Sequence, residues 1–288
     1  MKVLITGSEG FIAQNLIRIL IKNKIQVFGI NKSKKKSKIN YFCIHHNLLK
    51  SIDFKKINLA DIDFIIHLAG VTEHNKIVKS EEFINDTKKI LKNTLTIANK
   101  LNCKYFIYAS SGKVYKRTNK IITTRTKIRP DSILGKAKVI AENIIVNSNI
   151  FKKNKIKILR IFNVYGKNQS QQFLVPNILK QIKDIKKKKQ GRIELGNLDV
   201  KRDFIYIDDL SKIILKIIKS PGEFKMITNI SSGYSINPKY IAKKLLKANK
   251  IECDIISKRS KIREETKNEV VYQKNKKSNF LKNVKNLV

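Results

Sequence analysis

Residues 2–20, KVLITGSEGFIAQNLIRIL, decide the fold of this chain. Residues 2–6 are an apolar run of the length of a buried strand, and apolar residues recur at helical spacing from Phe11 onwards. Between the two patterns, Gly7 and Gly10 stand where a strand must turn sharply into a helix. The stretch therefore predicts a strand, a glycine turn and a helix.

The same alternation continues along the chain. Strand-like apolar runs lie at 25–30, 41–45, 62–70, 104–111 and 155–166, and helical patterns lie at about 80–101 and 131–148. Strands that are regularly separated by helices predict a parallel sheet with helices on both faces. The sequence has no repeat of 20 to 50 residues and no long linker. We therefore expect an α/β fold with a doubly wound parallel sheet.

The composition describes a globular chain with an unusual excess of lysine. Its 288 residues are 42% hydrophobic, enough for a substantial core, and the formal net charge is +40. Only nine of the 62 basic residues are Arg, and the Lys residues are spread along a chain that is also rich in Ile and Asn. Bidentate recognition of phosphate and bases favours Arg. We therefore interpret the charge as a composition bias and expect no specific nucleic-acid partner.

Several other classes of protein are disfavoured by the sequence. Cys43, Cys103 and Cys253 lie far apart, so we expect neither a disulfide framework nor a zinc site. His45 and His46 are adjacent, and neighbouring residues on a strand point to opposite faces, so we expect no metal site there. The first ten residues lack a signal-peptide pattern, and no apolar run reaches 18 residues. We expect a cytoplasmic protein without a membrane partner.

The glycine turn has a chemical implication beyond the fold. Gly7 permits the tight turn, and Gly10 allows backbone amides to approach a pyrophosphate. The following helix would present aligned N–H groups and the positive end of its dipole. Ala13 is small enough to replace the third glycine of this kind of motif. The stretch therefore predicts a dinucleotide-binding turn, and a plain strand-to-helix turn is the alternative.

Seven stretches, in this order, carry a resemblance to a known family. They are TGSEGFIA (6–13), IIHLAG (65–70), YASSGKVY (108–115), GKAKVIAE (135–142), LRIFNVYGKNQ (159–169), GNLDVKRDFIYIDDL (196–210) and NISSGYSI (229–236). The chain resembles the extended short-chain dehydrogenase/reductases, which are NAD(P)-dependent epimerases, dehydratases and reductases of nucleotide sugars. The resemblance implies a Rossmann domain at 1–165 and a smaller C-terminal α/β substrate domain at 166–288, partly interleaved with the first.

The resemblance also implies a cofactor site. At the matching positions, Gly7, Gly10, Phe11 and Ile12 would hold the dinucleotide phosphates. The residues that would surround the rest of the cofactor are Asn47 and Leu48 beside the adenine, and Leu68, Ala69 and Gly70 along its length.

Four residues match positions that would act on the sugar or near it. Ser111 matches the active-site Ser or Thr whose hydroxyl bonds the sugar oxygen, although a strand-end hydroxyl satisfied by backbone is the alternative. Lys138 would hydrogen-bond the nicotinamide ribose. Asn163 would contact the phosphate or sugar of the substrate. Arg202 would pair with two oxygens of its diphosphate, with an ion pair to Asp203 as the alternative.

One position departs from the family pattern. The family carries its proton-transferring Tyr four residues before Lys138, and this chain has Leu134 there. Glu142 follows Lys138 at the expected spacing, and no Tyr lies between 116 and 164, so no shift of the alignment supplies one. Leucine can neither donate nor accept a proton.

Three explanations of Leu134 stay open: a degenerate member that binds cofactor without turnover, a branch in which another group transfers the proton, and an enzyme with reduced activity. The retention of the other site residues favours an enzyme. Candidate substitutes for the missing hydroxyl are Glu73, His74 and Lys136.

The resemblance leaves cofactor and substrate partly open. Asn31 stands where an NAD-preferring member usually has Asp, and Lys32 and Lys34–Lys36 follow, so NADP is slightly favoured over NAD. The stretch at 196–204 looks like that of GDP-mannose dehydratases and GDP-4-keto-6-deoxymannose reductases. It implies a GDP-like deoxysugar substrate in surface polysaccharide precursor synthesis. The family commonly forms homodimers, here through the helices near 80–101 and 131–148.

Overall fold

The computed structural model describes residues 1–32, 39–53, 59, 61–70, 80–116, 118–262, 270–271, 283 and 287. The chain divides into two compact units. The first comprises Met1–Lys116, Lys127–Ile161 and Asp208–Asn229, and the second comprises Arg117–Thr126, Phe162–Ile207 and Ile230–Val288. Each unit is therefore built from segments that are far apart in the sequence.

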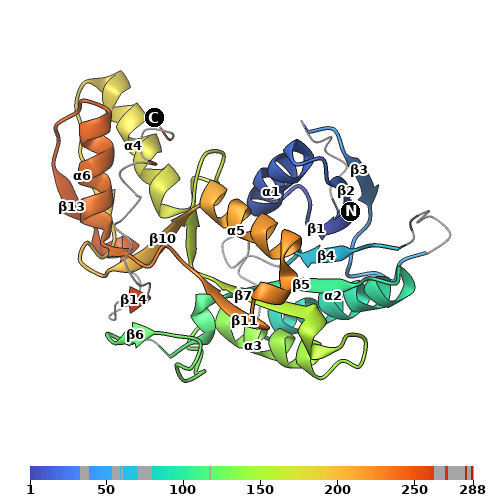
Figure 1. Cartoon of the computed structure of the whole chain (residues 1–288). Coiled ribbons are helices and arrows are strands. Elements are labelled where there is room, and N and C mark those ends of the chain that lie inside the picture. Colours follow the sequence, from blue (N-terminus) through green and yellow to red (C-terminus); the bar gives the residue numbers. More distant parts are fainter. Residues whose placement is uncertain are drawn as a thin grey trace. The chain divides into compact units, whose positions relative to one another are not determined.

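A seven-stranded sheet forms the centre of the first unit, in the order β11-β7-β5-β4-β1-β2-β3 (Figure 1). Its strands are β1 (Lys2–Thr6), β2 (Gln26–Asn31), β3 (Phe42–His45), β4 (Phe64–His67), β5 (Tyr105–Ser111), β7 (Ile156–Ile161) and β11 (Ile227–Ile230). The pairs from β3 through β7 are all parallel. This order, in which the chain starts in the middle and moves first to one side and then to the other, is the predicted doubly wound arrangement.

Helices cover both faces of this sheet. They are α1 (Phe11–Lys22), α2 (Ser80–Lys100), α3 (Ile133–Val146) and α5 (Ile207–Lys219). Figure 1 shows α1 and α5 on one face and α2 and α3 on the other. The strands β1 and β4 are almost entirely buried between these layers, which explains why they are continuous apolar runs in the sequence.

Two helices of this unit begin at a favourable N-cap residue. Gly10 is the N-cap of α1, and Ser132 caps α3 by accepting a hydrogen bond from the Gly135 amide at 3.1 Å. The predicted pattern at 131–148 is thus a helix two residues shorter at each end. The predicted strand at 155–166 is two strands, β7 and β8 (Asn163–Tyr165), separated by Phe162.

The second unit contains smaller sheets and two long helices. Strand β10 (Arg202–Tyr206) pairs in parallel with β8 and antiparallel with β12 (Ser235–Ile236). The remaining elements are the parallel pairs β9 (Ile193–Leu195) with β13 (Ile255–Ser257) and β6 (Ile121–Ile122) with β14 (Val270–Val271), and the helices α4 (Leu174–Lys188) and α6 (Pro238–Ala248), which pack together. Short 3-10 turns complete the described chain at Gly112–Val114, Lys153–Lys155, Pro221–Glu223 and Arg259–Lys261.

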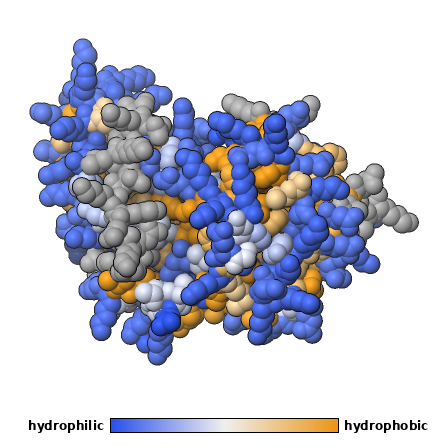
Figure 2. Space-filling model, in the orientation of Figure 1, coloured by the Kyte–Doolittle hydropathy of each residue, from blue (hydrophilic) through white to orange (hydrophobic). Residues whose placement is uncertain are grey.

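Polar side chains are distributed over many elements. Figure 2 shows hydrophilic residues over most of the visible face, with apolar residues in smaller groups between them. Lysines occur in the last turns of α1, α2, α4, α5 and α6. No helix in the described ranges is both long enough and apolar enough to cross a membrane.

Candidate active site

The turn between β1 and α1 requires glycine at its first position. Gly7 has φ +68°, and a Cβ there would lie 2.9 Å from the backbone N and Cα of Ala69. The Gly7 amide donates to the Ile30 carbonyl at 2.8 Å, and the Gly10 amide donates to the Gly7 carbonyl at 2.9 Å. These contacts place the turn between the carboxyl ends of β2 and β4.

The N-terminus of α1 fits a phosphate group. Gly10 caps it without a side chain, and the first turn, which is fully described, holds no acidic residue. Its free amides and its dipole favour an anion. Phe11 and Ile12, both half-buried, begin the helix. The cradle thus has the open backbone that the dinucleotide pyrophosphate would need.

The other residues expected around the cofactor lie along the same edge of the sheet. Asn31 ends β2, and its carbonyl accepts the His46 amide at 2.9 Å, which brings Asn47 and the buried Leu48 to this edge. Lys32 is exposed. Lys34–Lys36 lie outside the described residues.

Leu68, Ala69 and Gly70 directly follow β4 at this edge. The Ala69 amide donates to the Thr6 hydroxyl at 3.2 Å, and the space where a Cβ of Gly70 would lie is open to a distance of 4 Å. The structure therefore brings the described members of the expected cofactor set together at the carboxyl edge of one sheet, where ligands of such folds bind.

A pair that the sequence did not predict stands beside the glycine turn. The Tyr41 hydroxyl donates a short hydrogen bond to the Glu9 carboxylate, and the Gln14 amide also donates to Glu9 at 3.3 Å. The Tyr41 ring covers Gly29 of β2, where a Cβ would lie 2.5 Å from a ring carbon. Burial, and then the bond to Glu9, raises the pKa of Tyr41. A carboxylate is thus held next to the phosphate cradle.

Ser111 and Lys138 lie at the carboxyl end of β5. The Lys138 ammonium donates to the Ala109 carbonyl at 2.6 Å, two residues before Ser111 on the same strand. The Ser111 hydroxyl accepts the Lys113 amide at 3.2 Å, so one of its lone pairs is used by backbone, as in the structural alternative. A hydroxyl retains its own proton and a second lone pair for a ligand.

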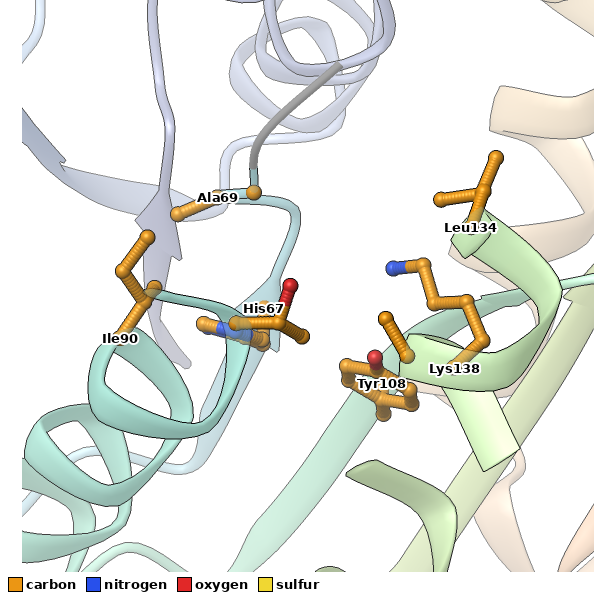
Figure 3. A pocket seen from close by; sticks show the side chains of 9 residues that line it. His67, Ala69, Ile90, Tyr108, Leu134 and Lys138 are labelled. Carbon is orange, nitrogen blue, oxygen red and sulfur yellow. The ribbon is translucent and has the colours of Figure 1, made fainter. Parts of the chain in front are cut away.

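A small cavity lies between α2, α3 and strands β4 and β5 (Figure 3). Its volume is about 10 Å³, and Leu134, Lys138, Tyr108 and His67 are among its lining residues. Figure 3 shows Leu134 at the beginning of α3, one turn above Lys138, whose amine points away from the helix into the space. The missing tyrosine position therefore borders the cavity that holds the lysine amine.

Burial shifts the ionisation of the groups around this cavity. Desolvation lowers the pKa of Lys138 to about 8, against a raising effect of Glu142. Desolvation and the charge of Lys138 lower the pKa of His67 to about 3, so this imidazole is neutral at physiological pH. His67 is bonded through Nδ1 to the Thr6 hydroxyl at 2.9 Å. It acts as an uncharged link between β1 and β4.

A buried ion pair fixes α3 against the sheet. The Arg160 guanidinium donates to both carboxylate oxygens of Glu142, at 3.1 and 2.6 Å, and Ser110 donates to the same carboxylate. Arg160 also donates to the Tyr115 hydroxyl at 2.9 Å, which donates to the Asn229 side chain at 2.6 Å. Tyr115 therefore belongs to the hydrogen-bond network around this ion pair.

Of the suggested substitutes for the missing tyrosine, only Lys136 belongs to the described residues, and it does not line the cavity. Lys136 is exposed on α3. Glu73 and His74 lie outside the described residues. Two cavity-lining residues carry hydroxyls, Thr87 of α2 and Tyr108 of β5, and the sequence singled out neither. The Thr87 hydroxyl donates to the Phe83 carbonyl at 2.9 Å.

The expected substrate residues belong to the second unit, where they lie on neighbouring strands. Asn163 of β8 pairs with Phe204, two residues after Arg202 of β10. The Asn163 amide donates to the Asp203 carbonyl at 2.9 Å. The Asp203 carboxylate accepts the amides of Ser232 and Tyr234 at 2.7 and 3.0 Å, and burial raises its pKa to about 6. Asp203 thus anchors the loop before β12.

A comparison of sequences identifies the family. The family model described as "NAD dependent epimerase/dehydratase family" matches residues 3–231, which include both the glycine turn and the Ser111–Lys138 region. The chain belongs to this epimerase/dehydratase family. Its position in the extended short-chain dehydrogenase/reductases and its Rossmann fold, expected from the sequence, are confirmed.

Relatives within the family act on nucleotide sugars. The chain is 30% identical over 242 residues to a GDP-6-deoxy-D-talose 4-dehydrogenase of Aggregatibacter actinomycetemcomitans, covering 82% of this chain and 76% of the relative. It is 26% identical over 212 residues to a GDP-6-deoxy-D-mannose reductase of Pseudomonas aeruginosa, covering 70% and 68%. The fold is similar to that of a UDP-N-acetylglucosamine 4-epimerase from Methanobrevibacter ruminantium M1, with TM-score 0.80, 19% identity, and coverage of 99% and 96%.

Proposed function

We propose that this family member is an NAD(P)-dependent oxidoreductase that acts on a GDP-linked 4-keto-6-deoxysugar or a related NDP-deoxysugar, for surface polysaccharide precursors. The observation that carries the proposal is the placement of Ser111 and Lys138 at the carboxyl end of β5, on the sheet edge that also carries the glycine turn. Relatives that act on GDP-6-deoxysugars support the substrate class.

Each site residue has a role in this proposal. The turn residues Gly7, Gly10, Phe11 and Ile12 bind the pyrophosphate through the N-terminus of α1. When bound, the nicotinamide supplies or removes a hydride. Ser111 donates a hydrogen bond to the sugar oxygen, and Lys138 holds the nicotinamide ribose.

The remaining roles complete the two binding sites. Asn47, Leu48, Leu68, Ala69 and Gly70 line the rest of the dinucleotide. In the second unit, Asn163 and Arg202, close to each other on β8 and β10, bind the sugar and the diphosphate of the substrate.

The cofactor preference in this proposal is NADP(H). Asn31 supplies no carboxylate for a ribose 2′-hydroxyl, and Lys32, exposed beside it, provides charge for a 2′-phosphate. Asn31→Asp should weaken NADPH binding at least tenfold and leave NADH binding unchanged or tighter. Calorimetric titration of both nucleotides into both proteins tests this preference, and equal affinities of the natural protein for the two would contradict it.

Leu134 supports a second candidate, a cofactor-binding protein with a regulatory or scaffold role. A leucine at this position borders the cavity and supplies no proton. Both candidates bind the cofactor, but only the oxidoreductase converts a nucleotide sugar to product.

The test is an assay of GDP-, UDP- and dTDP-linked parent and 4-keto sugars with NAD(H) and NADP(H), with products measured by mass spectrometry. We expect product from a GDP-deoxysugar, reduced at least 100-fold in Ser111→Ala. Leu134→Tyr should restore the usual proton donor and raise kcat, with Leu134→Phe as the control of equal bulk. Tight cofactor binding without product from any sugar would support the scaffold candidate instead.

A further inference from the structure

Tyr108 presents a hydroxyl that the fold leaves unsatisfied. Its side chain is 1% exposed, and its oxygen has no hydrogen-bond partner in the described part of the chain. Leaving such a group unpaired costs about 1–3 kcal/mol, so buried hydroxyls normally find a protein or water partner. Tyr108 lines the cavity beside α3, and a ligand or water there would supply the missing bond.

The cavity has the size and the polarity for one water molecule. Its volume of about 10 Å³ is close to the minimum for a single water. The Lys138 amine lies over the Tyr108 ring, 4.7 Å from its centre, and the two polar atoms face the same space in Figure 3. One proton of the ammonium is bound to the Ala109 carbonyl, so two remain, one for the water and one for the nicotinamide ribose or the substrate oxygen.

Leu134 determines what this arrangement can do. A tyrosine there would place a hydroxyl beside the cavity that holds the lysine amine, one turn along the same face of α3. The leucine side chain offers no proton. The Lys138 amine is then the titratable group on this face of α3 that lies nearest to residue 134. The groups facing the amine are His67 from β4, which is neutral, Tyr108 from β5, and Glu142 from α3, which is engaged by Arg160.

We propose that Lys138 itself transfers the proton in this protein, and that Tyr108 positions its amine through one bound water. The proposal rests on the oxidoreductase function proposed above. In the reducing direction, the carbonyl carbon accepts a hydride from the reduced nicotinamide, which becomes oxidised. The carbonyl oxygen takes a proton from the Lys138 ammonium, leaving a neutral amine. The amine regains a proton from solvent through the water at Tyr108.

The ionisation of both residues suits these roles. The lowered pKa of Lys138, about 8, lies near the operating pH, as an efficient general acid requires. Burial, and then Glu142, raises the pKa of Tyr108, so its hydroxyl stays neutral and can only hold the water. The ammonium is the active form in reduction, so kcat should fall as pH rises above about 8.

The experiment compares Lys138→Arg with the natural protein in the GDP-sugar assay. Arginine keeps the positive charge near the ribose but cannot give up its proton at these pH values. We expect kcat to fall at least 100-fold, cofactor Kd to change less than about fivefold, and the added change Leu134→Tyr to recover at least tenfold. Lys136→Arg, on the exposed side of α3, is the matched control and should be unaffected.

Tyr108→Phe tests the positioning role. We expect a five- to fiftyfold fall in kcat with KM little changed, and a shift in the pH at which Lys138 titrates. Competitive acetylation with trace acetic anhydride, analysed by peptide mass spectrometry across pH, measures this titration without turnover.

The outcomes separate this proposal from the function on which it rests. If the natural protein turns over and Lys138→Arg retains more than a third of kcat with the same pH profile, the lysine does not move the proton and only this inference fails. A natural protein that binds cofactor but gives no product overturns the proposed function and this role with it. Titration of Lys138 near pH 10.5, as in an exposed lysine, would also contradict the role.

Discussion

Leu134 and Lys138 are neighbours on one face of α3, and together they determine which group can transfer a proton at this site. The loss of an acid/base group alone typically reduces a rate by about 10²- to 10⁴-fold. Hydride transfer between bound partners still gains from positioning and electrostatics. A protein with Leu134 is therefore compatible with catalysis if the amine behind it takes part.

A second residue-scale effect concerns Glu9 beside the glycine turn. Its carboxylate is held by Tyr41 and Gln14 just before α1, where it would repel the phosphates of a cofactor bound at the helix N-terminus. We expect Glu9→Gln to tighten binding of both NADH and NADPH by about two- to fivefold. Isothermal titration calorimetry at low salt measures the change, with Glu223→Gln as a control acid. Weaker binding in Glu9→Gln would show that the carboxylate contacts the cofactor favourably.

The sequence indicated some of these residues and not others, for a physical reason. Gly7 was predictable because the turn between strand and helix requires a positive φ, a conformation that glycine adopts without strain. Lys138 was predictable because the stretch GKAKVIAE (135–142) resembles a motif of the family. The contacts of Tyr41 with Glu9 and of Tyr108 with the cavity depend on how distant segments meet, and no local pattern encodes them.

At the level of elements, the Glu142–Arg160 pair joins α3 to β7. Both side chains are about 5–7% exposed, and removal of one partner leaves a buried charge. Arg160→Met should lower the free energy of unfolding by about 3–5 kcal/mol, and adding Glu142→Met should recover part of the loss. Urea unfolding followed by circular dichroism provides the values. A loss below 1 kcal/mol in Arg160→Met would contradict the structural role given to this pair.

The start of α3 depends on a glycine with no room for a side chain. A Cβ on Gly135 would lie 2.3 Å from the Lys113 carbonyl oxygen and 2.8 Å from the Pro130 side chain. Gly135→Ala should therefore cost about 1–3 kcal/mol by forcing the helix away from the turn at 112–114. Gly70→Ala is the matched control, since nothing lies within 4 Å of its Cβ position, and it should change stability by less than about 0.5 kcal/mol. Thermal unfolding of the three proteins separates the two cases.

The elements themselves were largely predictable, and their boundaries were less so. Apolar periodicity indicated every strand of the first unit's sheet except β11, and every helix on its two faces except α5. Burial on both faces produces the continuous apolar strands that carry this signal. It did not show that the run at 155–166 breaks at Phe162, where the chain passes from one compact unit to the other. That break follows from tertiary contacts and not from local propensity.

At the scale of the whole molecule, we predict a homodimer through α2 and α3. These helices pack together on one face of the sheet, and Ile140 and Ile144 of α3 remain partly exposed. Light scattering should give about twice the chain mass of 33.3 kDa. Ile140→Glu should shift the protein to a monomer, since it places a charge in an apolar contact. A natural protein that is monomeric at micromolar concentration would contradict this interface.

The charge of the whole chain bears on its partners as well. With a net charge of +40, weak binding to any polyanion is expected at low salt. Specific binding of a GDP-sugar should persist at 0.15 M salt, because it depends on shaped contacts as well as on charge.

We propose above all that this chain transfers a hydride between a nicotinamide and a nucleotide sugar although residue 134 is leucine. The most direct measurement is incubation of the natural protein with a GDP-4-keto-6-deoxysugar and NADPH or NADH deuterated at the nicotinamide C4 position, followed by mass spectrometry of the sugar. We predict a reduced product that carries one deuterium, formed faster by Leu134→Tyr and lost in Ser111→Ala. Saturating cofactor binding with no deuterium in any sugar would contradict the claim and leave a protein that acts by binding alone.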